Sequence, residues 1–123
     1  TEENTLSLHD ALPILLFVRM QAANDAADLD DLRNFTTPEL FAALRLDLQD
    51  RSDARQTTDV VKVDAALVDF AQEDARQIVS VRFTGLIREE PGADAQPFDE
   101  VWHLVRPQDE SRPWAIAGIQ QAQ

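Results

Sequence analysis

The residues best suited to acid–base chemistry lie in the C-terminal half of the chain. His103 and Asp99 are four residues apart in a stretch with strand character. That spacing separates them by about 13 Å along a strand, which is too far for a direct hydrogen bond. A histidine–aspartate dyad within one strand is therefore excluded, although a neighbouring strand could still supply a partner. We interpret His103 as an exposed or structural histidine.

Glu100 offers a second route to acid–base chemistry. It shares a strand face with Trp102, Leu104 and Arg106. If it lay buried near the mouth of a curved sheet, its pKa would rise and it could act as a general base. Glu100 could equally form an ion pair across the sheet. We favour the ion pair, with Arg82, Arg88 or Arg106 as its partner.

A set of aspartates around Arg82 offers a third route. Asp64, Asp69 and Asp99 could combine with this arginine in the Asp–Arg–Asp arrangement with which some enzymes activate water on an epoxide. A chain this rich in aspartate places such sets together by accident. We therefore regard convergence of these side chains as the less favoured interpretation.

Composition excludes several other classes of function. The chain has 123 residues, with 23 acidic and 11 basic side chains and a net charge of −12, so nucleic acid is a poor candidate partner. It contains no Cys, which excludes disulfides, thiolate catalysis and zinc–cysteine sites. It contains no phosphate-binding glycine loop, no HExxH and no GxSxG sequence. We expect no cofactor, no metal and no catalytic residues.

The start of the chain differs in character from the rest. Residues 5–14, TLSLHDALPI, resemble one reading frame of a common short-read sequencing adapter. We interpret residues 1–14 as a non-native segment joined to a domain that occupies residues 15–123. The alternative is a genuine N-terminal cap, with Asp10 preceding a helix. No apolar run approaches the roughly 20 residues that a membrane-spanning helix requires.

Apolar periodicity changes from helical to alternating midway along the chain. Helical spacing extends over 15–27, 28–35 and 38–50, with Asp28 and Thr37 as N-cap residues and Pro38 at the first helical position. A polar connection follows over 50–58. Alternation then predicts strands over 60–70, 78–88, 98–106 and 114–121, joined by hairpin loops.

Helices followed by hairpin-linked strands predict an α+β domain. The N-terminal helices should pack on one face of a curved four-stranded antiparallel sheet. Gly85 and Gly118 lie within strands and are suitable positions for bends. This arrangement resembles the nuclear-transport-factor-two-like fold, a cystatin-like cone with an apolar interior.

The C-terminal half carries the strongest family signal. SVRFTGLIRE, PFDEVWHLVRP and WAIAGIQQ occur in that order, after the helical LDDLRNFTTPELFAALRLDL. Together they resemble a bacterial Tim44-like domain over about residues 15–123. The family takes its name from the tether of the mitochondrial inner-membrane import motor.

The resemblance implies a non-enzymatic, membrane-associated binding or scaffold domain, related to the preprotein translocase tether and located at the bacterial cell envelope. Its partner would be a protein or a lipid acyl chain. Many bacterial relatives carry a hydrophobic N-terminal segment that this sequence lacks, so the residues present should behave as a soluble domain. The alternative is a small-molecule enzyme of the same fold, of the isomerase, cyclase or epoxide hydrolase type.

The lining of the cone distinguishes these alternatives. Several convergent polar groups would favour an enzyme, whereas an apolar or filled interior would favour a binding module. The candidate lining or ligand-contacting residues are Phe83, Ile87, Glu100, Trp102, Leu104 and Trp114. We expect Trp102 to be the inward anchor. Apolar residues also occur on the opposite strand faces, which predicts a weak homodimer through the sheet.

Overall fold

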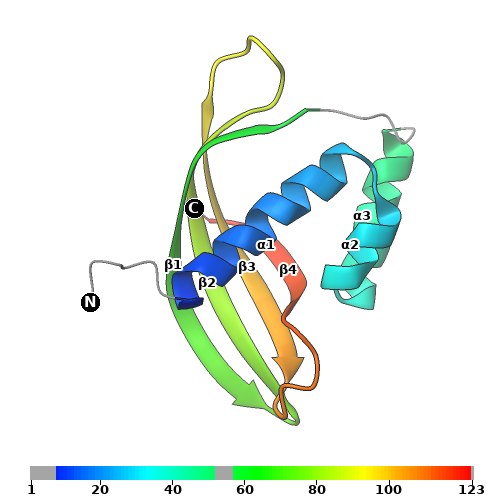
Figure 1. Ribbon diagram of the computed structural model, residues 1–123, viewed down its shortest axis with the longest axis vertical. Helices are drawn as coiled ribbons and strands as arrows, with labels where there is room; N and C mark the ends of the chain where they lie inside the picture. Colours follow the sequence, from blue (N-terminus) through cyan, green and yellow to red (C-terminus); the bar gives the residue numbers. More distant parts are fainter. Residues whose placement is uncertain (1–7, 52–56, 123) are drawn as a thin grey trace.

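The computed structural model describes residues 8–51 and 57–122, with side chains described from residue 12 onward. It confirms the predicted α+β order of three helices followed by one antiparallel sheet (Figure 1). The elements are α1 (Leu8–Asp25), α2 (Leu29–Phe35), α3 (Pro38–Asp50), β1 (Asp59–Glu73), β2 (Arg76–Arg88), β3 (Gln96–Pro107) and β4 (Ala115–Gln121). The predicted connection over 50–58 lies mainly outside the described residues.

Local capping interactions set the starts of α2 and α3. The carboxylate of Asp28 accepts a hydrogen bond from the Asp31 backbone N–H. The hydroxyl of Thr37 accepts one from the Leu40 backbone N–H, with Pro38 at the first helical position. These contacts satisfy backbone donors that a helix start leaves unpaired, so both predicted N-caps are confirmed.

The first helix differs from its prediction at both ends. It begins at Leu8 rather than residue 15, so Asp10 lies inside α1 and does not precede it. It ends at Asp25 because Ala27 adopts a φ of 55°. The Asp28 backbone N–H then bonds to the Ala23 carbonyl, which closes the helix.

The four strands pair in chain order as an antiparallel sheet. The β1–β2 hairpin is longer than predicted, with backbone pairing continuing through Gln72–Gln77 to a turn at Asp74. The side chains there are polar and show no alternation, so the sequence pattern gave no strand signal. The backbone ladder depends on N–H and C=O groups and continues without such a pattern.

Two register irregularities coincide with the strand glycines. The β1–β2 pairing shifts between Val60 and Lys62, next to the Val63–Gly85 pair. A Cβ on Gly85 would lie only 1.9 Å from the Lys62 carbonyl oxygen. The β3–β4 pairing shifts next to Gly118, where an added Cβ would meet a His103 ring carbon at 3.5 Å, an ordinary contact.

We therefore predict opposite outcomes for two glycine substitutions. Gly85→Ala should destabilise the domain by about 1–3 kcal/mol, because the new methyl group overlaps backbone that cannot rotate away. Gly118→Ala, the matched control, should change the free energy of unfolding by less than about 0.5 kcal/mol. Urea unfolding measures both, and equal losses would contradict the close approach at Gly85.

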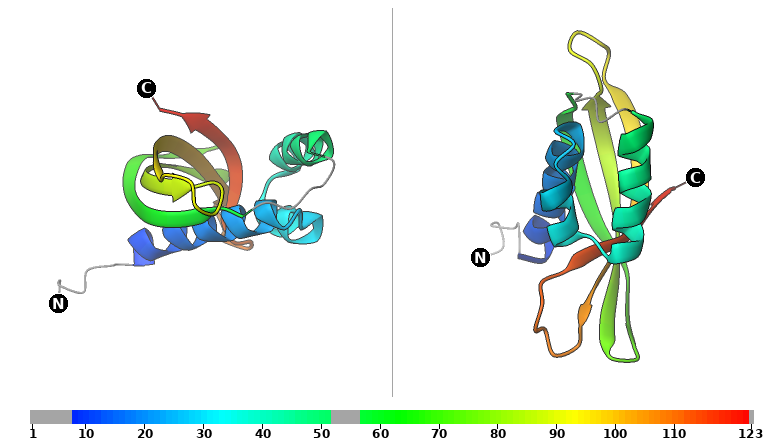
Figure 2. Two further views of the ribbon diagram at one scale, coloured as in Figure 1. Left: turned by 90° about the horizontal axis from the view of Figure 1, so that it is seen from above. Right: turned by 90° about the vertical axis from the view of Figure 1, so that its right-hand side faces the viewer.

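The sheet curves, and α1 lies across its concave side (Figure 2). Phe17 of α1 is the centre of this contact. Its ring centroid lies 4.9 Å from Phe83, 5.2 Å from Phe98 and 5.0 Å from Trp102. Phe17, Phe83 and Trp102 are almost completely buried, so this aromatic cluster forms the centre of the core.

The short helices attach at the β4 edge of the sheet. Thr36 forms an isolated parallel bridge with Ile116, and the Thr37 backbone N–H donates to the Ile116 carbonyl at 2.9 Å. Ile116, Leu32 and Leu48 are fully buried. The helices α2 and α3 thus extend the core past β4, while α1 alone covers the concave face.

Trp102 is 1% exposed and lies on the inward face, as the strand alternation predicts. Trp102→Ala should therefore cost about 3–5 kcal/mol of unfolding free energy, the range for large core truncations. Trp114→Ala, at a partly exposed tryptophan, should cost clearly less. Urea unfolding of the two variants provides the measurement, and a loss below about 1 kcal/mol for Trp102→Ala would contradict its role in the core.

Candidate functional site

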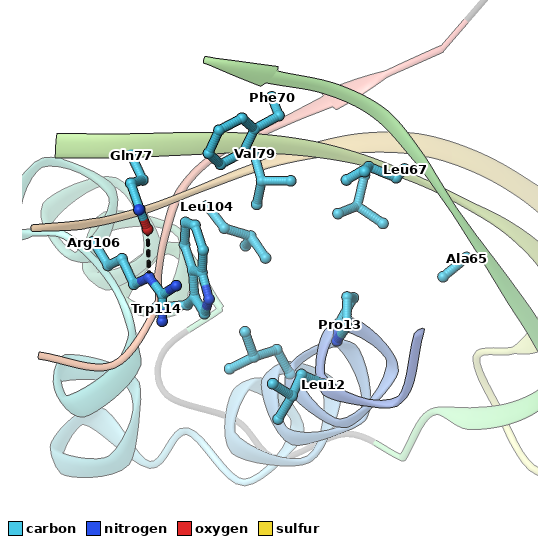
Figure 3. Close-up of a pocket in the computed structure, with 12 residues that line it drawn as sticks. Leu12, Pro13, Ala65, Leu67, Phe70, Gln77, Val79, Leu104, Arg106 and Trp114 are labelled. Carbon is cyan, nitrogen blue, oxygen red and sulfur yellow. Dashed lines mark hydrogen bonds between the residues drawn. The ribbon is translucent and has the colours of Figure 1, made fainter. Parts of the chain in front are cut away.

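A groove of about 510 Å³ opens between the N-terminal part of α1 and the concave face of the sheet (Figure 3). Its volume falls in the range of about 300–1,000 Å³ that is usual for small-molecule sites. Residues of α1, of the first three strands and of the loop before β4 contribute. The lining residues are Leu12, Pro13, Leu16, Ala65, Leu67, Phe70, Gln77, Val79, Val81, Leu104, Arg106 and Trp114.

The groove forms because large aromatic side chains fill one end of the helix–sheet contact and smaller side chains face each other at the other end. At one end, Phe17 fills the space above Phe83 and Trp102. Toward the other end, α1 contributes Leu12, Pro13 and Leu16, while the facing strand positions include Ala65 and Val79. These smaller side chains leave open volume where an aromatic residue would close it.

The rim of the groove is apolar and exposed. Leu67 is 64% exposed, Phe70 50% and Leu12 48%. Large apolar side chains grouped around a concavity are more informative than single exposed ones, because they mark surfaces that bind something. Leu12 belongs to the segment 1–14, whose sequence we interpreted as non-native, so sheet residues are the better positions for substitutions.

One end of the groove is polar. Gln77 and Arg106 are cross-strand partners on β2 and β3, and Arg106 Nε donates to Gln77 Oε1 at 2.7 Å. The Arg106 guanidinium carbon lies 4.4 Å from the ring centroid of Trp114, a cation–π contact. Its Nη2 lies 3.3 Å from a carboxylate oxygen of Glu110. Arg106 is the one ionisable side chain among the described lining residues.

Five of the six predicted lining residues occupy three different environments. Leu104 and Trp114 line the groove. Phe83 and Trp102 lie in the aromatic cluster beneath Phe17. Ile87 is partly buried near the far end of β2, where it pairs with Val60.

The ion pair that we favoured for Glu100 was a wrong prediction. It forms no ion pair across the described sheet. Its Oε1 accepts a hydrogen bond from the Trp102 indole N–H at 2.9 Å, and its Oε2 accepts one from Gln121 at 3.2 Å. The three arginines proposed as partners bind other carboxylates: Arg82 binds Asp99, Arg88 binds Asp59 and Arg106 binds Glu110. Glu100 instead pairs with the indole that projects from its own strand face.

His103 lies on the outer face of the sheet, away from the groove. Its Nδ1 lies 2.8 Å from Ser80 Oγ and its Nε2 lies 2.9 Å from Gln120 Oε1. Both contacts come from neighbouring strands, which the sequence left open. They hold the ring between β2 and β4, so His103 has a structural role in this position.

The aspartates around Arg82 do not form an Asp–Arg–Asp set. Arg82 Nε donates to Asp99 at 2.8 Å, and this contact holds the pKa of the Asp99 carboxyl below its ordinary value. Asp64 lies 3.8 Å from the Lys62 ammonium instead. Asp69 is paired in register with Ser80. The Arg82–Asp99 pair is on the outer face, where it links β2 to β3.

From the sequence we placed Arg106 on the inward strand face and considered it only as an ion-pair partner of Glu100. The signal was available, because Arg106 has the same strand parity as Trp102 and Leu104. A cation on an otherwise apolar strand face indicates that one end of this face is polar. Leu67, Phe70 and Val79 were also missed, since their importance depends on how far α1 reaches along the sheet.

Two features are absent among the residues that the structure describes. No group of three or more His, Asp or Glu side chains among them is arranged to hold a metal ion. None of their helices is both long enough and apolar enough to cross a membrane.

Comparison with known proteins gives one family. The model of the Tim44-like domain matches residues 15–121, which is most of the chain. No curated protein matches. The solution structure of a SEC-C motif-containing protein from Rhodopseudomonas palustris is similar over 83% of this chain and 72% of that one, with a TM-score of 0.43 and 17% identity, too distant to support an argument. The match over residues 15–121 establishes that the chain belongs to the Tim44-like domain family.

Proposed function

We propose that this domain is a non-catalytic binding module that takes up a single acyl chain in the groove between α1 and the sheet. The observation that carries the proposal is the lining. Among the described lining residues, only Gln77 and Arg106 have strongly polar side chains, and both lie at one end of the groove. An apolar concavity of this size stabilises an apolar chain by removing its surface from water.

The enzymatic alternative has less support. General acid–base catalysis needs a group that gains or loses a proton near the working pH. The described groove lining contains no carboxylate and no imidazole. Neither an amide nor a guanidinium exchanges protons near neutral pH. Glu100 and His103, the two residues considered for such a role, have their hydrogen bonds elsewhere.

Membership of the Tim44-like family supports a scaffold role, and we extend the proposal to association with the membrane of the bacterial cell envelope, in the manner of the translocase tether. The net charge of −12 opposes attraction to an anionic bilayer. Membrane contact of these residues would therefore occur through apolar uptake. A protein segment that presents an apolar side is the competing occupant of the groove.

We predict that Leu67→Asp weakens binding of dodecanol about tenfold or more. The substitution removes apolar rim area and places a carboxylate that must lose water when the chain enters. Val68→Asp is the matched control, since Val68 is the next residue, is 57% exposed and does not line the groove. Titration calorimetry on the wild type and both variants provides the measurement.

Two results would contradict the acyl-chain proposal. One is the absence of dodecanol binding to the wild-type chain. The other is an equal loss in the Leu67 and Val68 variants, which would indicate nonspecific attachment to exposed apolar residues. Because both side chains are exposed, neither substitution should alter the free energy of unfolding by more than about 0.5 kcal/mol.

The predicted homodimer stays a proposal about the outer face of the sheet. Val101 and Val105 lie there, partly buried, beside the contacts of His103. We predict a reversible dimer at high micromolar concentration in analytical ultracentrifugation, because partly exposed apolar surface on an outer sheet face favours weak association. A strict monomer at those concentrations would contradict it.

A further inference from the structure

We infer that Arg106 makes the groove selective for a carboxylate-headed chain, a fatty acid, over a neutral chain of the same length. The inference rests on the proposed acyl-chain function and specifies its ligand class. The guanidinium lies at one end of the groove, so a chain that follows the apolar lining past Val79 and Leu104 brings its head group to Arg106 (Figure 3).

Three contacts hold the guanidinium in place at this end. Gln77 accepts from Nε, the Trp114 ring supports one face at 4.4 Å, and Glu110 lies 3.3 Å from Nη2. The Arg106 side chain is only 25% exposed. A fixed, partly desolvated guanidinium favours a planar two-oxygen acceptor, because its N–H donors form a fork that matches a carboxylate.

Glu110 is the present counter-ion, and it is a weak one. Its side chain is 57% exposed, and it lies in the loop after β3 with a φ of 59°. Exposed ion pairs of this kind contribute little to stability. A ligand carboxylate approaching from the apolar side can therefore replace Glu110, which turns back into solvent while Arg106 remains neutralised.

Charge and volume define the occupant further. On a chain with a net charge of −12, long-range attraction cannot concentrate anions at the surface, so any preference for an anion must come from a local cation. Arg106 is the one cation in the described lining, and a volume of about 510 Å³ suits one chain. The ligand that fits this charge and volume is a single-chain fatty acid.

The test compares dodecanoate with dodecanol, both below the concentration at which they form aggregates. Titration calorimetry gives the affinities, and tryptophan fluorescence, to which the groove-lining Trp114 contributes together with the buried Trp102, provides a second signal. The wild type should bind the acid about tenfold or more tightly than the alcohol, the scale of one charge-assisted hydrogen-bonded pair. Arg106→Gln should bring the ratio of the acid affinity to the alcohol affinity close to one, and this ratio is the readout.

Matched variants separate local from general electrostatic effects. Arg82→Gln removes an equal charge from the outer face of the same sheet, where Arg82 pairs with Asp99, and should keep the preference for the acid. Glu110→Gln should strengthen dodecanoate binding several-fold without affecting dodecanol, because the competing carboxylate is gone. Arg106→Lys should retain part of the preference, since it keeps the charge but loses the fork.

The outcomes distinguish this inference from the proposal on which it rests. Equal binding of acid and alcohol by the wild type would overturn the role of Arg106 and leave acyl-chain binding intact. Binding of neither would overturn both. Loss of the preference in Arg82→Gln as well as Arg106→Gln would assign it to overall charge and overturn the inference. Circular dichroism of each variant confirms that the comparison is made on folded protein.

Discussion

The contact of Phe17 with the aromatic side chains of the sheet is the interaction on which the rest of this structure depends. A curved sheet needs its concave face covered, and α1 is the one helix that crosses it. Phe17 packs on Phe83, Phe98 and Trp102 within about 5 Å between ring centroids. Tilted and stacked aromatic pairs at such distances add stability beyond their buried area. This one side chain thereby fixes the height of the helix over the sheet.

The position of that contact also divides the interior in two. Under Phe17 the space is filled, and nothing can bind there without unpacking the core. Beyond Phe17, α1 stays at a similar distance from the sheet. Leu16 and the smaller strand residues are too short to meet across the space between them. The groove is thus a consequence of where the bulky residue stands along α1. The packed core and the groove therefore share one helix–sheet interface and occupy different parts of its length.

The polar side chains differ between the two faces of the sheet and between the two ends of its inner face. On the outer face, the exposed Arg82–Asp99 pair and the contacts of the half-buried His103 join neighbouring strands, which suits structural links. On the inner face, Glu100 accepts a hydrogen bond from the Trp102 indole at the filled end. Arg106 stands at the open end with Gln77 and Trp114. Of these polar groups, Arg106 is the one whose charge lies at the edge of the apolar groove.

The sequence by itself determined the features that depend on neighbours in the chain: the N-caps Asp28 and Thr37, the alternation of β3 and the order of elements. Such features are predictable because their energetics are local. Tertiary structure alone decided the partner of Glu100 and the open volume between α1 and the sheet. Alternation shows which face a residue occupies, but not which side chain from a distant helix reaches it. The sequence therefore placed Arg106 on the inward face, and only the fold showed that it lies at the end of an open groove.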